Sequence, residues 1–291
     1  MQRIMFATDF SLHADRALEH ALELTRLFGA ELTVFTSAYV DPQALAAVAT
    51  GMAPSLVDES RADARQRIET LAGHLRSGGL RVQSAFSTQE PSGAICAQAA
   101  ELGADLVALG TRGRSALSYV LSGSVAERVS RLATAPVLTA HADSPGPAPY
   151  RCVLVPTDFS ADSNAALALA REIVLRTGGK LVLLHAYDLP HMMTIGAGLA
   201  AANIEKTLAD DAHARLAQLR GALSGVDVET IVSALQPDPA ISEAAARSHA
   251  DLIVMGTRGR TGLAHVLLGS TAERVLRRAQ VPVITVKGPR S

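Results

Sequence analysis

Two long stretches of this sequence occur twice. Residues 3–11, RIMFATDFS, recur as residues 152–160, CVLVPTDFS, and residues 104–114, ADLVALGTRGR, recur as residues 250–260, ADLIVMGTRGR. The period of almost 150 residues is far longer than the ~20–50 residues of a solenoid unit. The repeat therefore indicates two complete domains produced by duplication.

The boundary between the two halves is marked by composition. Residues 143–149, DSPGPAP, hold three prolines and one glycine, which predicts a short, stiff linker. We therefore expect domains at residues 1–142 and 150–291. A chain of 291 residues agrees with two domains of ordinary size.

Each half alternates short apolar runs with longer helical patterns. The predicted strands are 3–8, 31–38, 80–87, 105–110 and 136–140 in the first half, and 151–157, 180–187, 227–234, 251–256 and 282–286 in the second. Alternation of strand and helix predicts a parallel sheet with helices on both faces. Hydrophobic residues make up 48% of the chain but aromatic residues only 3%, so the core must consist of Ala, Val, Leu and Ile. Ser11 and Ser160 are expected helix N-caps, and Gly29 and Gly178 are expected C-caps.

A glycine pattern follows the fourth strand of each half with identical spacing. It is G-x2-G-x9-G-S, formed by Gly110, Gly113, Gly123 and Ser124, and by Gly256, Gly259, Gly269 and Ser270. Glycines let a main chain approach a phosphate closely, and the N-terminus of the following helix attracts anions. Ser124 with Glu127 and Ser270 with Glu273 also match the capping-box pattern. Taken alone, such a loop could equally be a tight strand-to-helix turn.

Polar residues follow the first strand of each half, at the same predicted sheet edge. Thr8 and Asp9, and Thr157 and Asp158, end strand one, where open α/β sheets bind ligands. The carboxylate can accept hydrogen bonds from a ribose hydroxyl or an adenine amine, although it could also cap the next helix. The arginines of the glycine loops could pair with phosphates or simply be exposed; they are Arg112, Arg114, Arg258 and Arg260.

The glycine pattern combined with Thr-Asp-Phe-Ser after strand one resembles the ATP-binding type of the universal stress protein family. The resemblance covers nearly the whole chain twice and implies two tandem Rossmann-like, flavodoxin-like, doubly wound domains with five parallel strands each. It implies that Asp9 and Asp158 bind adenine and ribose, that the glycines and serines of the pattern bind phosphates, and that Val125 and Thr271 border the two sites. A backbone contact to adenine falls near Ser37 or Ala186. Ser37 departs from the apolar residue usual there, and Ala7 stands where the second half has Pro156.

Several ligand classes are disfavoured by the sequence. The net charge of −1 and a pI near 6.8 give no basic field for nucleic acid. No stretch approaches the ~18 apolar residues of a membrane helix, and two cysteines without CxxC spacing fit a reducing cytoplasm. The histidines, among them His185, His191 and His265, lack a recognised ligand spacing, so no protein-held metal is expected, although Mg²⁺ could accompany a bound triphosphate.

These observations favour a stress-response protein that binds ATP, ADP or AMP as a non-catalytic or very slow signalling module. The sequence has neither a Walker lysine nor the G-x-G-x-x-G of dinucleotide enzymes. A slow ATPase or a nucleotidyl transferase of related fold is the alternative, and a protein-interaction scaffold without nucleotide is a third. The family resemblance also implies that the fifth strands pair within one chain, which leaves a further homodimer open.

Overall fold

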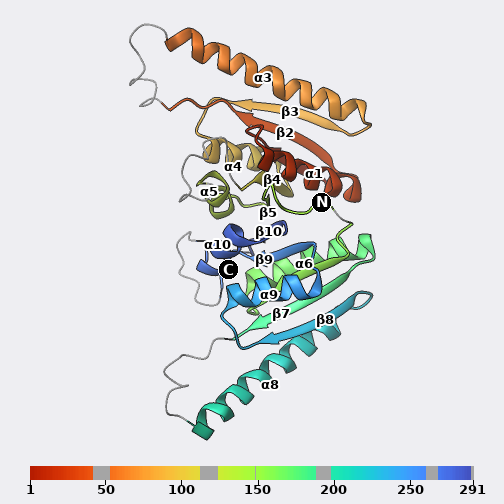
Figure 1. Cartoon of the computed structure of the whole chain (residues 1–291). Coiled ribbons are helices and arrows are strands. Elements are labelled where there is room, and N and C mark those ends of the chain that lie inside the picture. Colours follow the sequence, from red (N-terminus) through yellow and green to blue (C-terminus); the bar gives the residue numbers. More distant parts are fainter. Residues whose placement is uncertain (42–52, 112–123, 148, 188–197, 260–267, 290–291) are drawn as a thin grey trace. The chain divides into compact units, whose positions relative to one another are not determined.

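The computed structural model describes residues 1–41, 53–111, 124–147, 149–187, 198–259 and 268–289 (Figure 1). The chain divides into two compact units, Met1–Gly146 and Pro147–Ser291. The point of division lies inside the proline-rich segment. Each unit is an α/β domain with five parallel strands, as the alternating sequence pattern predicts.

The first unit contains five strands in the order β3-β2-β1-β4-β5, and every pairing is parallel. Its strands are β1 (Arg3–Ala7), β2 (Glu31–Ser37), β3 (Val82–Ser87), β4 (Leu106–Gly110) and β5 (Val137–Ala140). Its helices are α1 (Leu12–Phe28), α3 (Ala53–Ser77), α4 (Pro91–Leu102) and α5 (Ser124–Leu132). The strand order reverses between β1 and β4, which is where a doubly wound sheet opens a crevice.

The second unit repeats this arrangement with the strand order β8-β7-β6-β9-β10, again parallel. Its strands are β6 (Cys152–Pro156), β7 (Lys180–Ala186), β8 (Asp227–Ser233), β9 (Leu252–Gly256) and β10 (Val283–Val286). Its helices are α6 (Ala161–Thr177), α8 (Gly198–Ala222), α9 (Pro237–Ser248) and α10 (Ser270–Arg278). The predicted tandem doubly wound fold is therefore confirmed.

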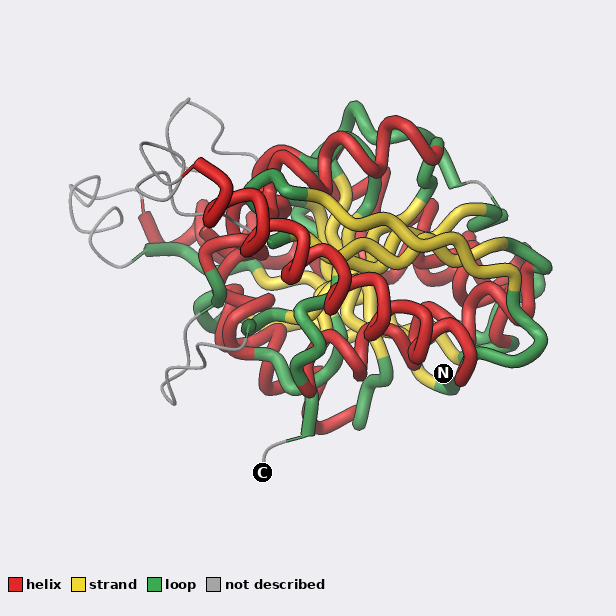
Figure 2. Tube along the Cα trace, turned by 90° about the horizontal axis from the view of Figure 1, so that it is seen from below, coloured by secondary structure: helices red, strands yellow, loops and turns green. Residues whose placement is uncertain are grey.

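Helices cover both faces of each sheet, and Figure 2 shows them on either side of the strands. Val107 and Leu109 of β4 pack in a buried cluster with residues of α4 and α5. Side chains alternate along a strand, so Leu106, Ala108 and Gly110 point to the other face, where α1 packs against β4. The last residue of β4 thus meets the beginning of α1.

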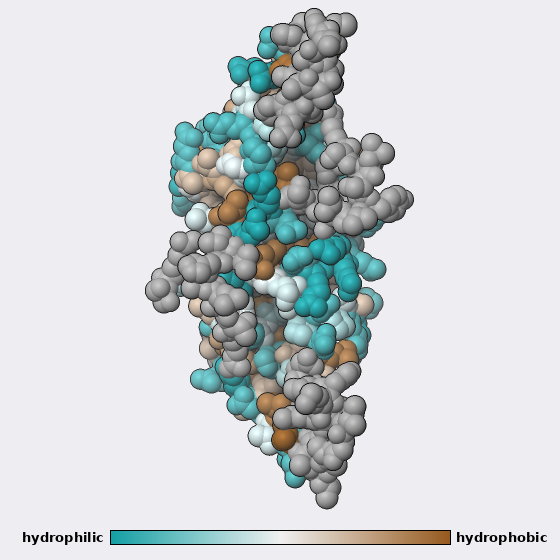
Figure 3. Space-filling view, turned by 90° about the vertical axis from the view of Figure 1, so that its left-hand side faces the viewer, coloured by the Kyte–Doolittle hydropathy of each residue, from teal (hydrophilic) through white to brown (hydrophobic). Residues whose placement is uncertain are grey.

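Local sequence signals set most helix ends as predicted. The Ser11 and Ser160 hydroxyls accept hydrogen bonds from the third residue of α1 and α6, and Gly29 and Gly178 end these helices in the left-handed conformation. Helices α4 and α9 each begin with a proline, whose fixed φ suits the first turn. Among the described residues, no helix is both long and apolar enough to cross a membrane. On the face in Figure 3, hydrophilic side chains are interspersed with smaller hydrophobic groups.

The end of the first unit folds back onto α1 through a buried histidine. His20 is 1% exposed, and its Nε2 donates a hydrogen bond of 3.2 Å to the carbonyl of Pro145. Burial, and secondarily the nearby Arg16 guanidinium, lower the pKa of His20 from 6.5 to about 4, against the opposing effect of the Pro145 hydrogen bond. His20 is therefore neutral in the folded protein above about pH 4.

We predict that this histidine makes the first unit sensitive to acid. Its pKa is lower in the folded than in the unfolded state, so protonation favours unfolding below the unfolded pKa of 6.5. The free energy of unfolding should fall by up to ~3 kcal/mol as the pH drops from 6.5 to 4, and then level off. Urea unfolding of His20→Gln should show a shallower pH dependence over this window than the wild type.

The matched control is His74→Gln, because His74 is exposed near the end of α3. This variant should keep the wild-type pH dependence. If His20→Gln also kept it, His20 would not be the titrating group.

Candidate functional site

The segment after β6 forms a tight polar turn at the carboxyl edge of the sheet. The Thr157 hydroxyl accepts a hydrogen bond of 3.0 Å from the Phe159 N–H, and Oδ1 of Asp158 accepts one of 3.1 Å from the Ser160 N–H. Phe159 has a φ of 64°, a left-handed conformation that is strained for an aromatic residue. The turn thus holds the Asp158 carboxylate beside the helix start without using Asp158 as the N-cap, which is Ser160.

The first unit builds the same turn after β1. The Thr8 hydroxyl accepts from the Phe10 N–H at 2.8 Å, and Oδ1 of Asp9 accepts from the Ser11 N–H and hydroxyl at 3.1 and 2.7 Å. Phe10 has a φ of 60°. Asp9 is therefore not the N-cap of α1. It orients Ser11, and Ser11 caps the helix.

Cationic side chains cover both strained phenylalanines. The Arg215 guanidinium of α8 lies 3.8 Å from the centre of the Phe159 ring, and Arg67 of α3 lies 4.0 Å from that of Phe10. His185 packs on Phe159 at 4.6 Å, and its Nδ1 donates to the Thr157 carbonyl at 2.7 Å. These contacts stabilise the left-handed backbone conformation of the two phenylalanines, which is otherwise unfavourable. Their partners lie more than 20 residues away along the chain, so the sequence pattern did not indicate them.

The glycine that ends β9 is required by packing. A Cβ on Gly256 would lie 2.9 Å from backbone atoms of Asp162 and Ser163, in the first turn of α6. Gly110 of β4 is equally crowded, with His13 and Ala14 of α1 at 2.6 and 2.7 Å. The family resemblance assigns these glycines to phosphate binding, and the structure shows that they also let a helix start approach the sheet.

The later glycines of the second unit bring the loop and the turn together. A Cβ on Gly259 would lie 2.9 Å from Oδ2 of Asp158. The Gly269 N–H donates a hydrogen bond of 2.8 Å to the Thr257 carbonyl, so the end of the loop lies against its beginning. A Cβ on Gly269 would approach that carbonyl to 3.0 Å. The turn carboxylate and both ends of the loop therefore share one small region.

The capping box predicted at Ser270 is wrong. Gly269 is the N-cap of α10, with extended backbone angles, and no side chain caps the helix. Ser270 is instead the first helical residue, and the Glu273 carboxylate pairs with Arg277 at 2.7 Å. The first amides of α10 have no acceptor within the helix, and its N-terminus carries the positive end of the helix dipole.

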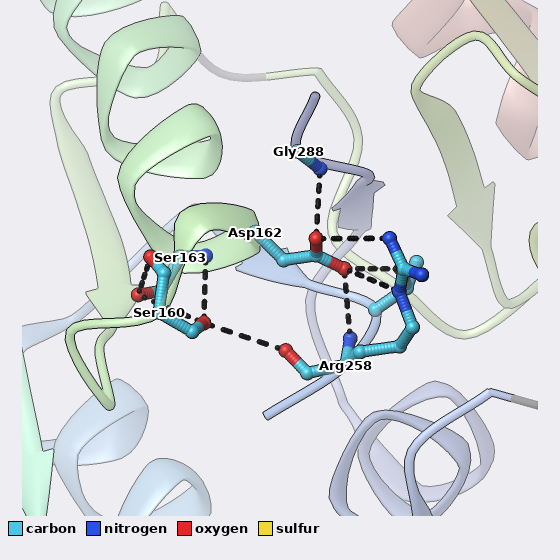
Figure 4. Close-up of polar contacts among 6 residues, drawn as sticks. Ser160, Asp162, Ser163, Arg258 and Gly288 are labelled. Atoms are coloured by element: carbon cyan, nitrogen blue, oxygen red, sulfur yellow. Dashed lines mark hydrogen bonds and ion pairs between the residues drawn. The ribbon is translucent and has the colours of Figure 1, made fainter. Parts of the chain in front are cut away.

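Arg258 of the loop makes an internal ion pair (Figure 4). Its Nε and Nη2 donate to the Asp162 carboxylate at 3.1 and 3.2 Å, and its backbone N–H donates at 3.1 Å. The Thr257 hydroxyl and the Gly288 N–H also donate to Asp162, each at 2.9 Å. Asp162 is 5% exposed, and its hydrogen bonds join the start of α6 to the Thr257–Arg258 segment and to Gly288. Sequence reasoning missed it.

The remaining expected site residues fall at the same sheet edge or outside the described residues. Ser37 and Ala186 end β2 and β7, and Val125 and Thr271 are the second residues of α5 and α10. Ser124 opens α5. Outside the described residues lie Arg112, Gly113, Arg114, Gly123, His191, Arg260 and His265. In the parts of the chain that are described, no three His, Cys, Asp or Glu side chains are grouped to hold a metal ion.

Known proteins place this architecture in a class and a family. Tandem doubly wound domains form a class of α/β proteins whose ligand sites lie outside the carboxyl ends of the strands. The model of the universal stress protein family matches residues 1–141 and again 149–287, and the chain belongs to that family.

Similar proteins cover both halves of the chain. A universal stress protein of Mycobacterium tuberculosis is 32% identical over 236 residues, which cover 79% of this chain and 77% of that protein. One from Mycolicibacterium smegmatis is 29% identical over 98% of this chain and 96% of its own length. The crystal structure of a universal stress protein from Archaeoglobus fulgidus matches with a TM-score of 0.72 and 26% identity, and covers 98% of each chain.

We predict that the strand-ending glycine is needed for stability. Gly256→Ala should lower the free energy of unfolding by ~1–3 kcal/mol, because the new methyl group presses on the backbone of α6. Gly221→Ala is the control, since a Cβ on Gly221 of α8 would meet nothing within 4 Å, and it should be neutral or stabilising by up to ~1 kcal/mol. Denaturant unfolding measures both. Equal stability of the two variants would contradict the packing role.

Proposed function

We propose that each unit binds an adenine nucleotide, with ATP as the principal ligand and ADP or AMP as the shorter alternatives, at the carboxyl edge of its sheet. The observation that carries the proposal is the close approach of Gly259 to the Asp158 carboxylate. A Cβ at position 259 would lie only 2.9 Å from Oδ2 of Asp158. The Asp158 carboxylate, which is the proposed ribose-binding group, therefore lies beside a loop residue whose main chain is not covered by a side chain. Membership of the universal stress protein family supports the same interpretation.

The proposed pose follows from the chemistry of the two sides. The Asp158 carboxylate accepts from a ribose hydroxyl or the adenine amine, and the backbone at Ala186 contacts the base. The phosphates lie between Gly259 and the uncapped start of α10, where Ser270 and Thr271 offer amides and hydroxyls. A Mg²⁺ ion would bridge phosphate oxygens and needs few protein ligands.

The first unit is proposed to bind in the same way. Asp9 occupies the turn as Asp158 does, and Ser37 takes the place of Ala186. The Ser37 hydroxyl donates to the Gln89 carbonyl at 2.5 Å, which turns this polar group toward the protein. Arg112, Gly113, Gly123, Ser124 and Val125 complete the set by sequence equivalence with the second loop.

We further propose that the chain is a signalling module with slow or no turnover of ATP. The turn and loop supply main-chain donors and one carboxylate, and Arg258 is engaged with Asp162 rather than reaching toward a ligand. We also propose that the protein is cytoplasmic and that its fifth strands, β5 and β10, pair within the chain. A homodimer is a further proposed state. Phosphate release with excess Mg·ATP should stay well below ~1 s⁻¹, the lower end of ordinary enzymes.

The binding proposal predicts a loss confined to one site. Gly259→Val should reduce the calorimetric stoichiometry from about two ATP per chain to about one, because the branched side chain fills the space beside Asp158. Isothermal titration of ATP into purified protein, first freed of nucleotide and checked by heat release of adenylate, measures the effect.

Gly221→Val is the control for this experiment. It places the same side chain at a position in α8 with nothing within 4 Å, and it should leave the stoichiometry unchanged. Unaltered affinity and stoichiometry in Gly259→Val would remove Gly259 from the site. A wild-type chain that takes up no adenine nucleotide would refute the proposed function.

A further inference from the structure

In each unit, the long helix that packs against the second and third strands also contacts the turn after the first strand. We call α3 and α8 the outer helices; α3 packs against β2 and β3, and α8 packs against β7 and β8 (Figure 1). The Arg215 guanidinium of α8 lies 3.8 Å from the centre of the Phe159 ring. The Arg67 guanidinium of α3 lies 4.0 Å from the centre of the Phe10 ring. The two arginine side chains are only 32% and 37% exposed, and a partly desolvated cation is attracted more strongly to a ring face.

The same set of side chains makes this contact in both units. Arg215 pairs with Asp211 at 3.8 Å, and Arg67 pairs with Asp63 at 3.9 Å, in each case with the residue four positions earlier. An exposed ion pair of this kind adds little stability by itself. Each guanidinium is therefore shared between a carboxylate of its own helix and the aromatic ring of the turn.

The second strand of each unit holds the other side of the turn. The Thr36 hydroxyl of β2 donates a hydrogen bond of 2.8 Å to the Thr8 carbonyl, and Nδ1 of His185 of β7 donates one of 2.7 Å to the Thr157 carbonyl. These carbonyls belong to the residue directly before the aspartate, whereas the phenylalanine directly follows it. Both neighbours of the aspartate are therefore anchored, one by the second strand and the other by the outer helix.

The conformation of the phenylalanine determines how the aspartate carboxylate is held. Phe159 has a φ of 64°, in a region that residues with side chains rarely adopt. The residue after it, Ser160, donates its backbone N–H to Oδ1 of Asp158 at 3.1 Å. If the ring lost its contacts, the backbone would gain freedom to leave this region, and the hydrogen bond that orients the carboxylate would weaken.

We propose that Arg215 and Arg67 are positioning residues that couple the outer helices to the nucleotide sites through the two phenylalanines. The inference rests on the proposed nucleotide binding, in which Asp158 and Asp9 accept hydrogen bonds from ribose or adenine. Each arginine stabilises the turn conformation that orients this carboxylate in advance, so it strengthens binding through the aspartate. Coupling free energies are reciprocal, so a nucleotide that fixes the turn also stabilises the contact of the outer helix with it.

The first test compares the ATP affinities of two variants of the same outer helix. Arg67→Met keeps the helix propensity but removes the cation over Phe10, and it should weaken ATP binding at the first site about fivefold. The matched control is Arg65→Met, because Arg65 lies 4.6 Å from the ring of Phe86, which belongs to β3 and not to the turn. This variant loses the same kind of contact and should leave ATP binding unchanged. Isothermal titration measures both.

The second unit tests the role of the charge. Arg215→Met should weaken the second site by a similar factor of about five, and Arg215→Lys, which keeps a cation near Phe159, should recover part of the loss. In each single methionine variant, only one of the two ATP molecules per chain should bind more weakly. In the variant that combines Arg67→Met with Arg215→Met, both should bind more weakly.

The second test follows the outer helices by hydrogen exchange. In the wild type, saturating ATP should slow the exchange of amides around Arg215 in α8 and around Arg67 in α3, because the bound nucleotide stabilises the contact of each helix with the turn. In the double methionine variant at saturating ATP, this protection of the helices should be lost, whereas the turns should still be protected by the ligand. A role confined to helix packing would not make the exchange of α3 and α8 depend on ATP.

Three results would overturn the inference while nucleotide binding stands. They are unchanged ATP affinity in both Arg67→Met and Arg215→Met, a loss in Arg65→Met equal to that in Arg67→Met, and exchange of the wild-type outer helices that ATP does not alter. A wild-type chain that binds no adenine nucleotide would overturn the proposed function and this inference together. If an arginine variant fails to fold, the exchange measurement on the wild type still decides.

Discussion

The close contact between a helix start and the last residue of the fourth strand governs the rest of each unit. At Gly256 and Gly110, the helix backbone comes nearer to the strand than any side chain allows. This approach brings the turn after strand one next to the loop after strand four, although some 95 residues separate them in the chain. The meeting of this turn and this loop at the reversal of strand order is therefore a consequence of backbone packing.

The fold was predictable because its signals are local and repeated. Apolar strands, serine N-caps and glycine C-caps act within a few residues, and the duplication displays each of them twice. The capping box at Ser270 failed for a local reason as well. The pattern S-x-x-E does not show which residue adopts the extended N-cap conformation, and in the structure Gly269 adopts it.

The contacts that hold the candidate site in place were not predictable from the sequence, because they join residues that only the fold brings together. Nothing in Thr-Asp-Phe-Ser indicates that its phenylalanine is left-handed or that Arg215, 56 positions on, covers the ring. The same is true of Asp162 and Arg258. The sequence also does not show the partners of the Asp162 carboxylate, which are Thr257, Arg258 and Gly288.

The glycines that both halves retain therefore have different structural roles at different positions. Gly110 and Gly256 would persist in a domain that binds nothing, because a methyl group at either would force the helix away from the sheet. Gly259 differs, since its missing side chain faces a carboxylate of the turn rather than the backbone of a packed helix. A side chain there would press on Oδ2 of Asp158, which belongs to the polar turn after β6. Under the proposed function, Gly259 is therefore a better indicator of the ligand site than Gly256.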